Sequence, residues 1–185
     1  MTLADLPAQF RLALRRVGQR PPSDLLVISI DRQRMDWWTR WKANGQPASY
    51  ELQKRFQVST SAFGVGQQEN SNQTPLGLHR VARKIGGGLP IGTVFRSRVP
   101  VGFTWQGMPE ARIVHRILWL QGLEPGLNRG GTVDSFDRYI YIHGFGDEST
   151  IGRPTSHGCI HMRAADLIPL FDRIREGTLV WISNS

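Results

Sequence analysis

Runs of apolar residues, continuous in some places and alternating in others, predict a chain built mainly of β-strands. Residues 25–30 form an almost continuous apolar run typical of a buried strand, and residues 112–120 form a second strong candidate. Residues 138–143 alternate tyrosine or histidine with isoleucine, as on a strand with two different faces. Further strands are expected over residues 35–41, 50–60 and 179–182.

Two further segments have the spacing of amphipathic helices. Over residues 3–17, apolar side chains recur on one face and arginines lie on the other. Residues 164–176 repeat this spacing, although Pro169 inside them should kink the helix or remove one of its backbone hydrogen bonds. We expect the N-terminal helix to occupy residues 1–22 and a single mainly β domain to occupy residues 23–185.

Glycine is frequent in the middle of the chain, where a phosphate-binding loop would be one interpretation. No GxGxxG or GxxxxGK[ST] pattern lies there between a strand and a helix. The segments 64–74 and 84–110 are therefore expected to be long loops that could cover a groove.

The charge and the apolar content restrict the class of protein. The net charge of +8 admits an anionic partner, but the scattered arginines equally describe a soluble basic surface. No nucleic-acid-binding motif is present, and no apolar stretch approaches the roughly 18 residues of a transmembrane helix. Residues 1–20 do not resemble an export signal. We therefore expect a cytoplasmic protein, or a periplasmic one whose signal has been removed.

The run Ser156–Ile160, which reads SHGCI, carries the strongest chemical signal. It contains Cys159, the single cysteine of the 185 residues, and His143 and Gly144 precede it at the end of an expected strand. A thiol served by a histidine base can attack a carbonyl and form a thioester. Gly158 would allow a tight turn that directs backbone N–H groups at a developing oxyanion.

Two other interpretations of these residues stay open. A lone cysteine is often a small buried hydrophobic residue. Alternatively, His157, Cys159 and His161 alternate, so on a regular strand they would face one way and His143 would complete a tetrahedral zinc site. Gly158 favours a turn instead, and no second cysteine or carboxylate supports a zinc-binding structural domain.

These residues resemble the L,D-transpeptidase catalytic domain (YkuD-type) family. Its hallmark is His-Gly on a strand followed, after a loop of similar length, by Ser/Thr-His-Gly-Cys, here His143-Gly144 and Ser156–Cys159. A second landmark is Thr-Pro-x-Gly, here Thr74–Gly77. The resemblance covers residues 24–182 and implies a β-sandwich or barrel-like fold with a helix after the cysteine. The site would lie in a groove between sheets.

The resemblance also implies roles for individual residues. Cys159 would be the nucleophile and His143 its base, with Gly144 orienting the imidazole. Backbone groups of His157, Gly158 and Cys159 would form the oxyanion hole, and no cofactor or metal is implied. Substrate contacts are expected from four residues, namely Ser156, His161, Arg163 and Tyr141. The family usually has arginine or asparagine at the position of His161, so Arg163 would take over a carboxylate contact.

The implied acyl donor is a peptidoglycan stem tetrapeptide, which would lose its terminal D-alanine to Cys159. Water as acceptor would make an L,D-carboxypeptidase of peptidoglycan recycling, and an amine on another stem would give the 3–3 cross-link of a transpeptidase. Because a cytoplasmic enzyme meets soluble muropeptides rather than the assembled wall, we expect the carboxypeptidase. A carbapenem is expected to bind Cys159 covalently. A catalytically silent wall-binding module is the alternative from another class.

Overall fold

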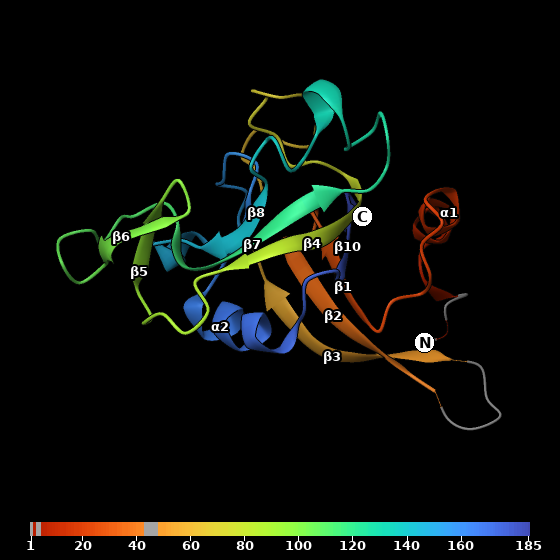
Figure 1. Ribbon diagram of the computed structural model, residues 1–185, viewed down its shortest axis with the longest axis horizontal. Coiled ribbons are helices and arrows are strands. Elements are labelled where there is room, and N and C mark those ends of the chain that lie inside the picture. The colour runs from red at the N-terminus through yellow and green to blue at the C-terminus, as the bar shows by residue number, and fades with distance from the viewer. Residues whose placement is uncertain (1, 3–4, 43–47) are drawn as a thin grey trace.

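A computed structural model describes residues 2, 5–42 and 48–185, which fold around a mixed β-sheet (Figure 1). Within these residues eight strands follow the order β3-β2-β1-β10-β4-β7-β5-β6, and β8 and β9 extend from β7. The strands are β1 (Asp24–Ser29), β2 (Arg34–Trp41), β3 (Ser49–Gln57), β4 (Gly77–Ile85), β5 (Thr93–Arg96), β6 (Val99–Phe103), β7 (Val114–Gly122), β8 (Tyr141–Gly144), β9 (Ile160–Met162) and β10 (Leu179–Ser183). The helices are α1 (Ala8–Arg16) and α2 (Ala164–Arg173), with the 3-10 turns η2 (Gly131–Val133) and η3 (Glu148–Thr150).

Strand β1 contributes to hydrophobic clusters on both faces of the sheet. Leu26 and Ile28 join the main core with α2, whereas Leu25 joins a second cluster with α1. Successive side chains of a strand point to opposite faces, so a strand that is buried on both sides has a continuous apolar sequence. Strand β10 lies parallel to β1 and antiparallel to β4, which places it inside the sheet.

The two helices cover different parts of this sheet. Helix α1 buries Phe10 and Leu14 on the second cluster, where the Phe10 ring packs edge-on against Trp181 at 5.7 Å. It begins at Ala8, later than the sequence pattern indicates, and Leu3 lies outside the described residues. Helix α2 stays continuous across Pro169, which therefore costs a backbone hydrogen bond without ending the helix. None of the helices in the described part of the chain has the length and apolar character needed to cross a bilayer.

The expectation of a long loop over residues 84–110 was wrong. This segment contains the end of β4 and the antiparallel hairpin β5–β6, which extends from one end of the sheet (Figure 1). Pro100 and Gly102 lie within β6, and both residues weaken a strand pattern. Proline is tolerated there because β6 is an edge strand, where one side of the backbone has no partner strand to bond.

Candidate active site

A tight turn presents Cys159 immediately before β9. Gly158 has a φ of +117°, a conformation that favours glycine. The hydroxyl of Ser156 donates to the carbonyl of Cys159 at 2.5 Å and accepts from the N–H of Gly158 at 3.3 Å. From the Thr-Pro-x-Gly segment, Thr74 Oγ1 donates to the carbonyl of Gly158 at 3.1 Å. The nucleophile candidate is thus held by side chains from two separate segments.

The surroundings of the Cys159 sulfur favour a neutral thiol at rest. Its Sγ donates to the carbonyl of Tyr139 and accepts from the N–H of Tyr141, both at 3.4 Å. Burial raises the pKa of the Cys159 thiol to about 11, against the opposing effects of the Tyr141 N–H and the Arg138 charge. A base is therefore required when the thiol reacts.

His143 lies on β8 in the arrangement that a base requires. Its Nδ1 is 2.7 Å from the carbonyl of Gly144, which can only accept, so Nδ1 carries the proton and Nε2 keeps a lone pair. Burial lowers the pKa of His143 to about 4, and the hydrogen bond to Gly144 opposes this shift. The imidazole is therefore neutral at ordinary pH.

The pairing of β8 with β9 brings the base and the thiol together. The two strands run parallel, with His143 opposite His161. Cys159 precedes His161 by two residues, which gives a Cα diagonal of about 8 Å to His143 from the usual strand spacings. Both side chains line a pocket of about 340 Å³. The remaining lining residues are Arg112, Ile113, Phe145, Thr155, His157 and His161.

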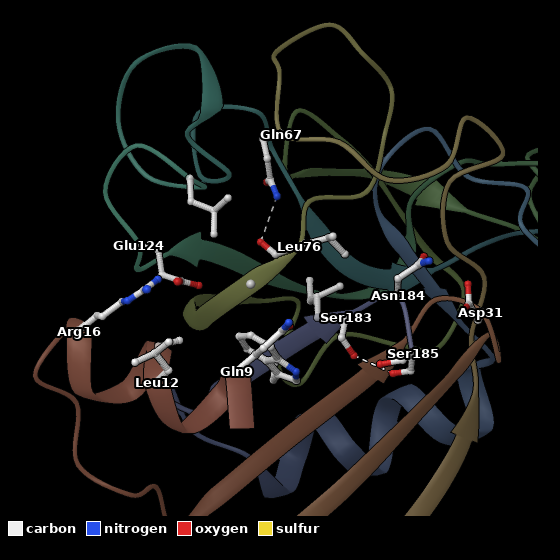
Figure 2. A pocket seen from close by; sticks show the side chains of 15 residues that line it. Gln9, Leu12, Arg16, Asp31, Gln67, Leu76, Glu124, Ser183, Asn184 and Ser185 are labelled. Carbon is white, nitrogen blue, oxygen red and sulfur yellow. Dashed lines mark hydrogen bonds between the residues drawn. The ribbon is translucent and has the colours of Figure 1, made fainter. Parts of the chain in front are cut away.

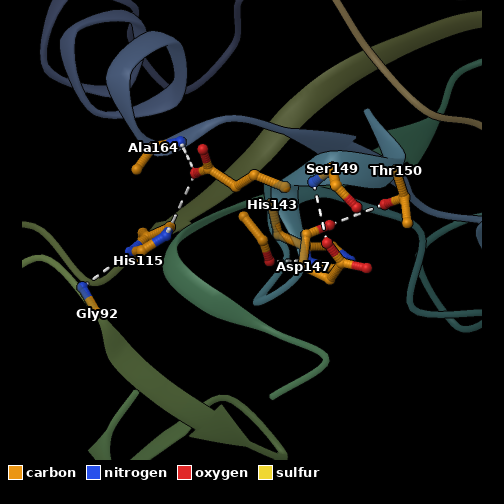
Figure 3. A network of polar contacts seen from close by, with 9 residues as sticks. Gly92, His115, His143, Asp147, Ser149, Thr150 and Ala164 are labelled. Carbon is orange, nitrogen blue, oxygen red and sulfur yellow. Dashed lines mark hydrogen bonds and ion pairs between the residues drawn. The ribbon is translucent and has the colours of Figure 1, made fainter. Parts of the chain in front are cut away.

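A glycine is required after His143. A Cβ at Gly144 would lie 2.4 Å from Cδ2 of His115 and 2.7 Å from the carbonyl oxygen of Val114. His115 belongs to a polar network beside this site (Figure 3). Its Nδ1 accepts from the N–H of Gly92 at 2.8 Å, and its Nε2 is 4.0 Å from Oε1 of Glu148. The same Glu148 oxygen accepts from Ala164 N at 2.6 Å, so the network joins the start of α2 to the segment after the base.

The expected strand over residues 138–143 was too long, because β8 begins only at Tyr141. Asp134 Oδ1 accepts the N–H of Phe136 at 2.8 Å, and the Asp134 carbonyl accepts the N–H of Arg138 at 2.9 Å. These bonds close a turn that leaves Tyr139 at a φ of +57° and about half exposed. The alternation of tyrosine and isoleucine is therefore a strand-like sequence pattern in residues that partly form a turn.

Arg138 is a site residue that the sequence did not indicate. Its Nη1 donates to the carbonyls of Gly66 and Gln67 at 3.2 and 2.8 Å, and its Nη2 donates to the carbonyl of Gln73 at 2.7 Å. One guanidinium thus holds the segment 64–74 beside the nucleophile, and its charge favours the Cys159 thiolate. The five hydrogen-bond donors of arginine suit several carbonyls at once, but no local sequence pattern marks that role.

Only one of the four residues expected to contact substrate lines the pocket, and it is His161. Ser156 is fully buried and uses its hydroxyl inside the turn. The hydroxyl of Tyr141 accepts from Arg98 at 3.1 Å beneath the surface, and Arg163 donates to Gln57 at 2.9 Å outside the pocket lining.

The expected oxyanion hole is also modified, because the N–H of Gly158 already donates to Ser156. The backbone N–H groups of His157 and Cys159 remain candidate donors. His157 is exposed, and its ring lies 5.3 Å from that of Phe63. Within the described ranges, no three His, Cys, Asp or Glu side chains converge as a metal site requires, so the donors of the zinc alternative are not assembled.

A larger pocket, of about 580 Å³, lies away from this chemistry between α1, the end of β10 and the start of β4 (Figure 2). Charged residues from separate elements reach it, including Arg16, Asp31 and Glu124. Neither Cys159 nor any histidine lines it. The larger pocket therefore lacks both proposed reactive groups, and the smaller pocket holds the thiol of Cys159 and the imidazole of His143.

Comparisons with known proteins agree with this fold. Among the solved structures it resembles, Bd1075 of Bdellovibrio bacteriovorus is 14% identical, with a TM-score of 0.53 over 88% of this chain and 48% of that one. An L,D-transpeptidase, LdtMt1, in complex with imipenem is 16% identical, with a TM-score of 0.50 over 87% of this chain and 59% of that one. The chain thus spans about half to three fifths of the length of these relatives.

The comparison with protein families is more specific than these structural likenesses. No curated protein matches the chain. The family model of the L,D-transpeptidase catalytic domain (YkuD), however, matches residues 23–182, which include both the His-Gly and the Ser-His-Gly-Cys segments. The match covers most of the chain and contains the thiol and the imidazole that share a pocket. The chain therefore belongs to the L,D-transpeptidase catalytic domain family.

Proposed function

We propose that this protein forms an acyl-enzyme on Cys159 with a peptidoglycan stem tetrapeptide and passes the acyl group to water, as an L,D-carboxypeptidase. The observation that carries the proposal is the placement of a thiol and a neutral imidazole, with its Nε2 lone pair free, in one pocket. The family match supports the class of reaction.

The reaction runs in two halves. Nε2 of His143 takes the Sγ proton as Cys159 attacks the carbonyl of the third stem residue. The tetrahedral intermediate then expels D-alanine, whose amine takes that proton from the imidazolium. Water, deprotonated by the same Nε2, attacks the thioester and releases a tripeptide and the thiol. Because Gly158 N–H is engaged by Ser156, the backbone N–H groups of His157 and Cys159 are the main-chain donors assigned to the oxyanion.

Transpeptidation is the second candidate function, and one observation favours it. A pocket of about 200 Å³ lies on the other side of His157, which lines both pockets. Glu69 and Asp137 line it, together with Asn70 and Asn72. Arg138 lines this pocket too, but its guanidinium donates to backbone carbonyls, and the two carboxylates leave the lining acidic overall. An ammonium group of an amine acceptor would therefore find matching charge there.

A cytoplasmic site of action, on soluble muropeptides, is part of the proposal. Cell fractionation followed by immunoblotting tests this location. Recovery in the periplasm would reject it and would favour the cross-linking role.

The activity test is incubation with a soluble disaccharide-tetrapeptide, with and without an amine acceptor, followed by mass spectrometry. Loss of D-alanine to give a tripeptide is expected, and Cys159→Ala should abolish it while the protein stays folded. Imipenem, which is bound by LdtMt1 in its solved structure, should add covalently to the wild-type protein alone. An amine-exchanged product would identify the transpeptidase instead. Full activity of Cys159→Ala would reject Cys159 as the nucleophile of either enzyme, and a wild-type protein that yields neither product would leave a wall-binding module.

A further inference from the structure

The acyl-transfer steps give no role to the ring nitrogens of His161, which lines the same pocket as Cys159 and His143. His161 lies on β9 opposite His143, and its ring is stacked flat on Phe145 at 4.6 Å and edge-on to His143 at 4.7 Å. Only 6% of the residue is exposed. Cys159 and His161 are two residues apart in extended chain and line the same pocket, so both side chains face the reacting group.

The environment of the two ring nitrogens fixes the tautomer of His161. Nδ1 is buried and has no hydrogen-bond partner in the described part of the chain. Nε2 also lacks a protein partner there, but it is not buried, so it faces the pocket. A buried N–H without an acceptor loses the hydrogen bond that it would make to water, and orphaned N–H groups are rarer than under-used acceptors. The proton therefore resides on Nε2, where a ligand can meet it.

His161 keeps this tautomer without charge. Burial, with the neighbouring imidazoles of His143 and His157, lowers its pKa to about 2. Toward the pocket, His143 thus presents a hydrogen-bond acceptor, the lone pair of its Nε2, and His161 presents a hydrogen-bond donor, its Nε2–H. No carboxylate lines this pocket that could take the His161 proton.

We propose that the Nε2–H of His161 donates a hydrogen bond to an oxygen of the acyl group that Cys159 attacks. This inference rests on the proposed acyl transfer. His161 would supply a side-chain donor to the oxyanion, because the N–H of Gly158 already donates to Ser156. The hydrogen bond from this donor becomes stronger as negative charge develops on the oxygen. Because His161 is neutral, it does not repel the proton that His143 receives.

A matched pair of substitutions tests the proposal. In His161→Gln an amide N–H₂ reaches about the position of Nε2, and in His161→Met a side chain of similar length and volume has no donor. Acylation by imipenem, followed by mass spectrometry, should be about tenfold slower in the Met variant than in the Gln variant, the value of one hydrogen bond. Alkylation of Cys159 by iodoacetamide, which develops no oxyanion, should proceed at the same rate in both.

Each outcome decides the proposal. Equal acylation of the two variants overturns it, as does a parallel loss of acylation and alkylation, which would place His161 in thiol activation. A wild-type protein that is alkylated by iodoacetamide, but neither acylated nor able to cleave tetrapeptide, would reject the proposed function itself. Circular dichroism checks folding, and the pair His161→Asn and His161→Leu asks the same question if the Met variant unfolds.

Discussion

At the residue scale, the proposed nucleophile and base, Cys159 and His143, rest as a neutral thiol and a neutral imidazole. Burial sets both pKa values, raising that of Cys159 to about 11 and lowering that of His143 to about 4. We expect the thiolate absorbance at 240 nm to rise only toward pH 11, and Cys159→Ala to lack this step. Acylation by imipenem should be flat at neutral pH and should fall as the pH drops through about 4, where His143 takes a proton. A thiolate step below pH 7 would contradict this and indicate a resting ion pair.

Gly144 is the second residue whose identity has a sharp consequence. In Gly144→Ala the new Cβ meets His115 and the backbone of Val114, neither of which can move freely. We expect a loss of about 1–3 kcal/mol in unfolding free energy, measured in urea, together with slower acylation, since the Gly144 carbonyl orients the base. Gly87→Ala is the matched control, because its Cβ would make only an ordinary 3.4 Å contact with Phe171. Equal stability of the two variants would refute the argument.

At the element scale, the segment 64–74 depends on a guanidinium from another part of the chain. Replacing Arg138 by alanine removes its bonds to the carbonyls of Gly66, Gln67 and Gln73 and the charge that favours the thiolate. Faster amide exchange should be confined to this segment, and alkylation of Cys159 should slow.

Two further variants control this experiment. Arg138→Lys should recover the positive charge but not the forked hydrogen bonds. It should therefore restore the alkylation rate of Cys159 more fully than it restores the protection of the amides in segment 64–74. Arg96→Ala, at an exposed arginine of β5, should change neither. Unchanged exchange in Arg138→Ala would show that the segment holds its position by other contacts.

At the scale of the whole molecule, the two hydrophobic clusters to which β1 contributes lie on opposite faces of the sheet. The pocket of Cys159 and His143 has no lining residue in the cluster under α1. Phe10→Ala should therefore cost about 3–5 kcal/mol of unfolding free energy while the acylation rate of the folded protein stays unchanged. Leu12→Ala on the same helix is the control, because Leu12 is 46% exposed. A slower acylation in Phe10→Ala would show that α1 influences the pocket.

The sequence predicted the elements whose pattern is local and missed those set by distant partners. Strand β1 and helix α2 were found because apolar spacing reports burial directly. The hairpin β5–β6 was hidden by Pro100 and Gly102, and the turn before Tyr141 was hidden by its tyrosine–isoleucine alternation. Cys159 and His143 were found from their motif and share the pocket. Arg163, although close in sequence, bonds to Gln57 instead, a contact across the fold that no spacing reveals.

The place of β10 has a consequence for biosynthesis. Leu179–Ser183 fills the gap between β1 and β4, so neither of those strands has its full set of neighbours until residue 183 has left the ribosome. Pairing across such a long sequence separation is slow, and until it occurs two strand edges are open to other chains. In a nascent chain or a product truncated before residue 179, β1 and β4 therefore lack the strand that joins them, and β7, β8 and β9 are not connected through the sheet to β1, β2 and β3. Assembly of Cys159 with His143 on this sheet therefore depends on residues 179–183, which are translated after both of them.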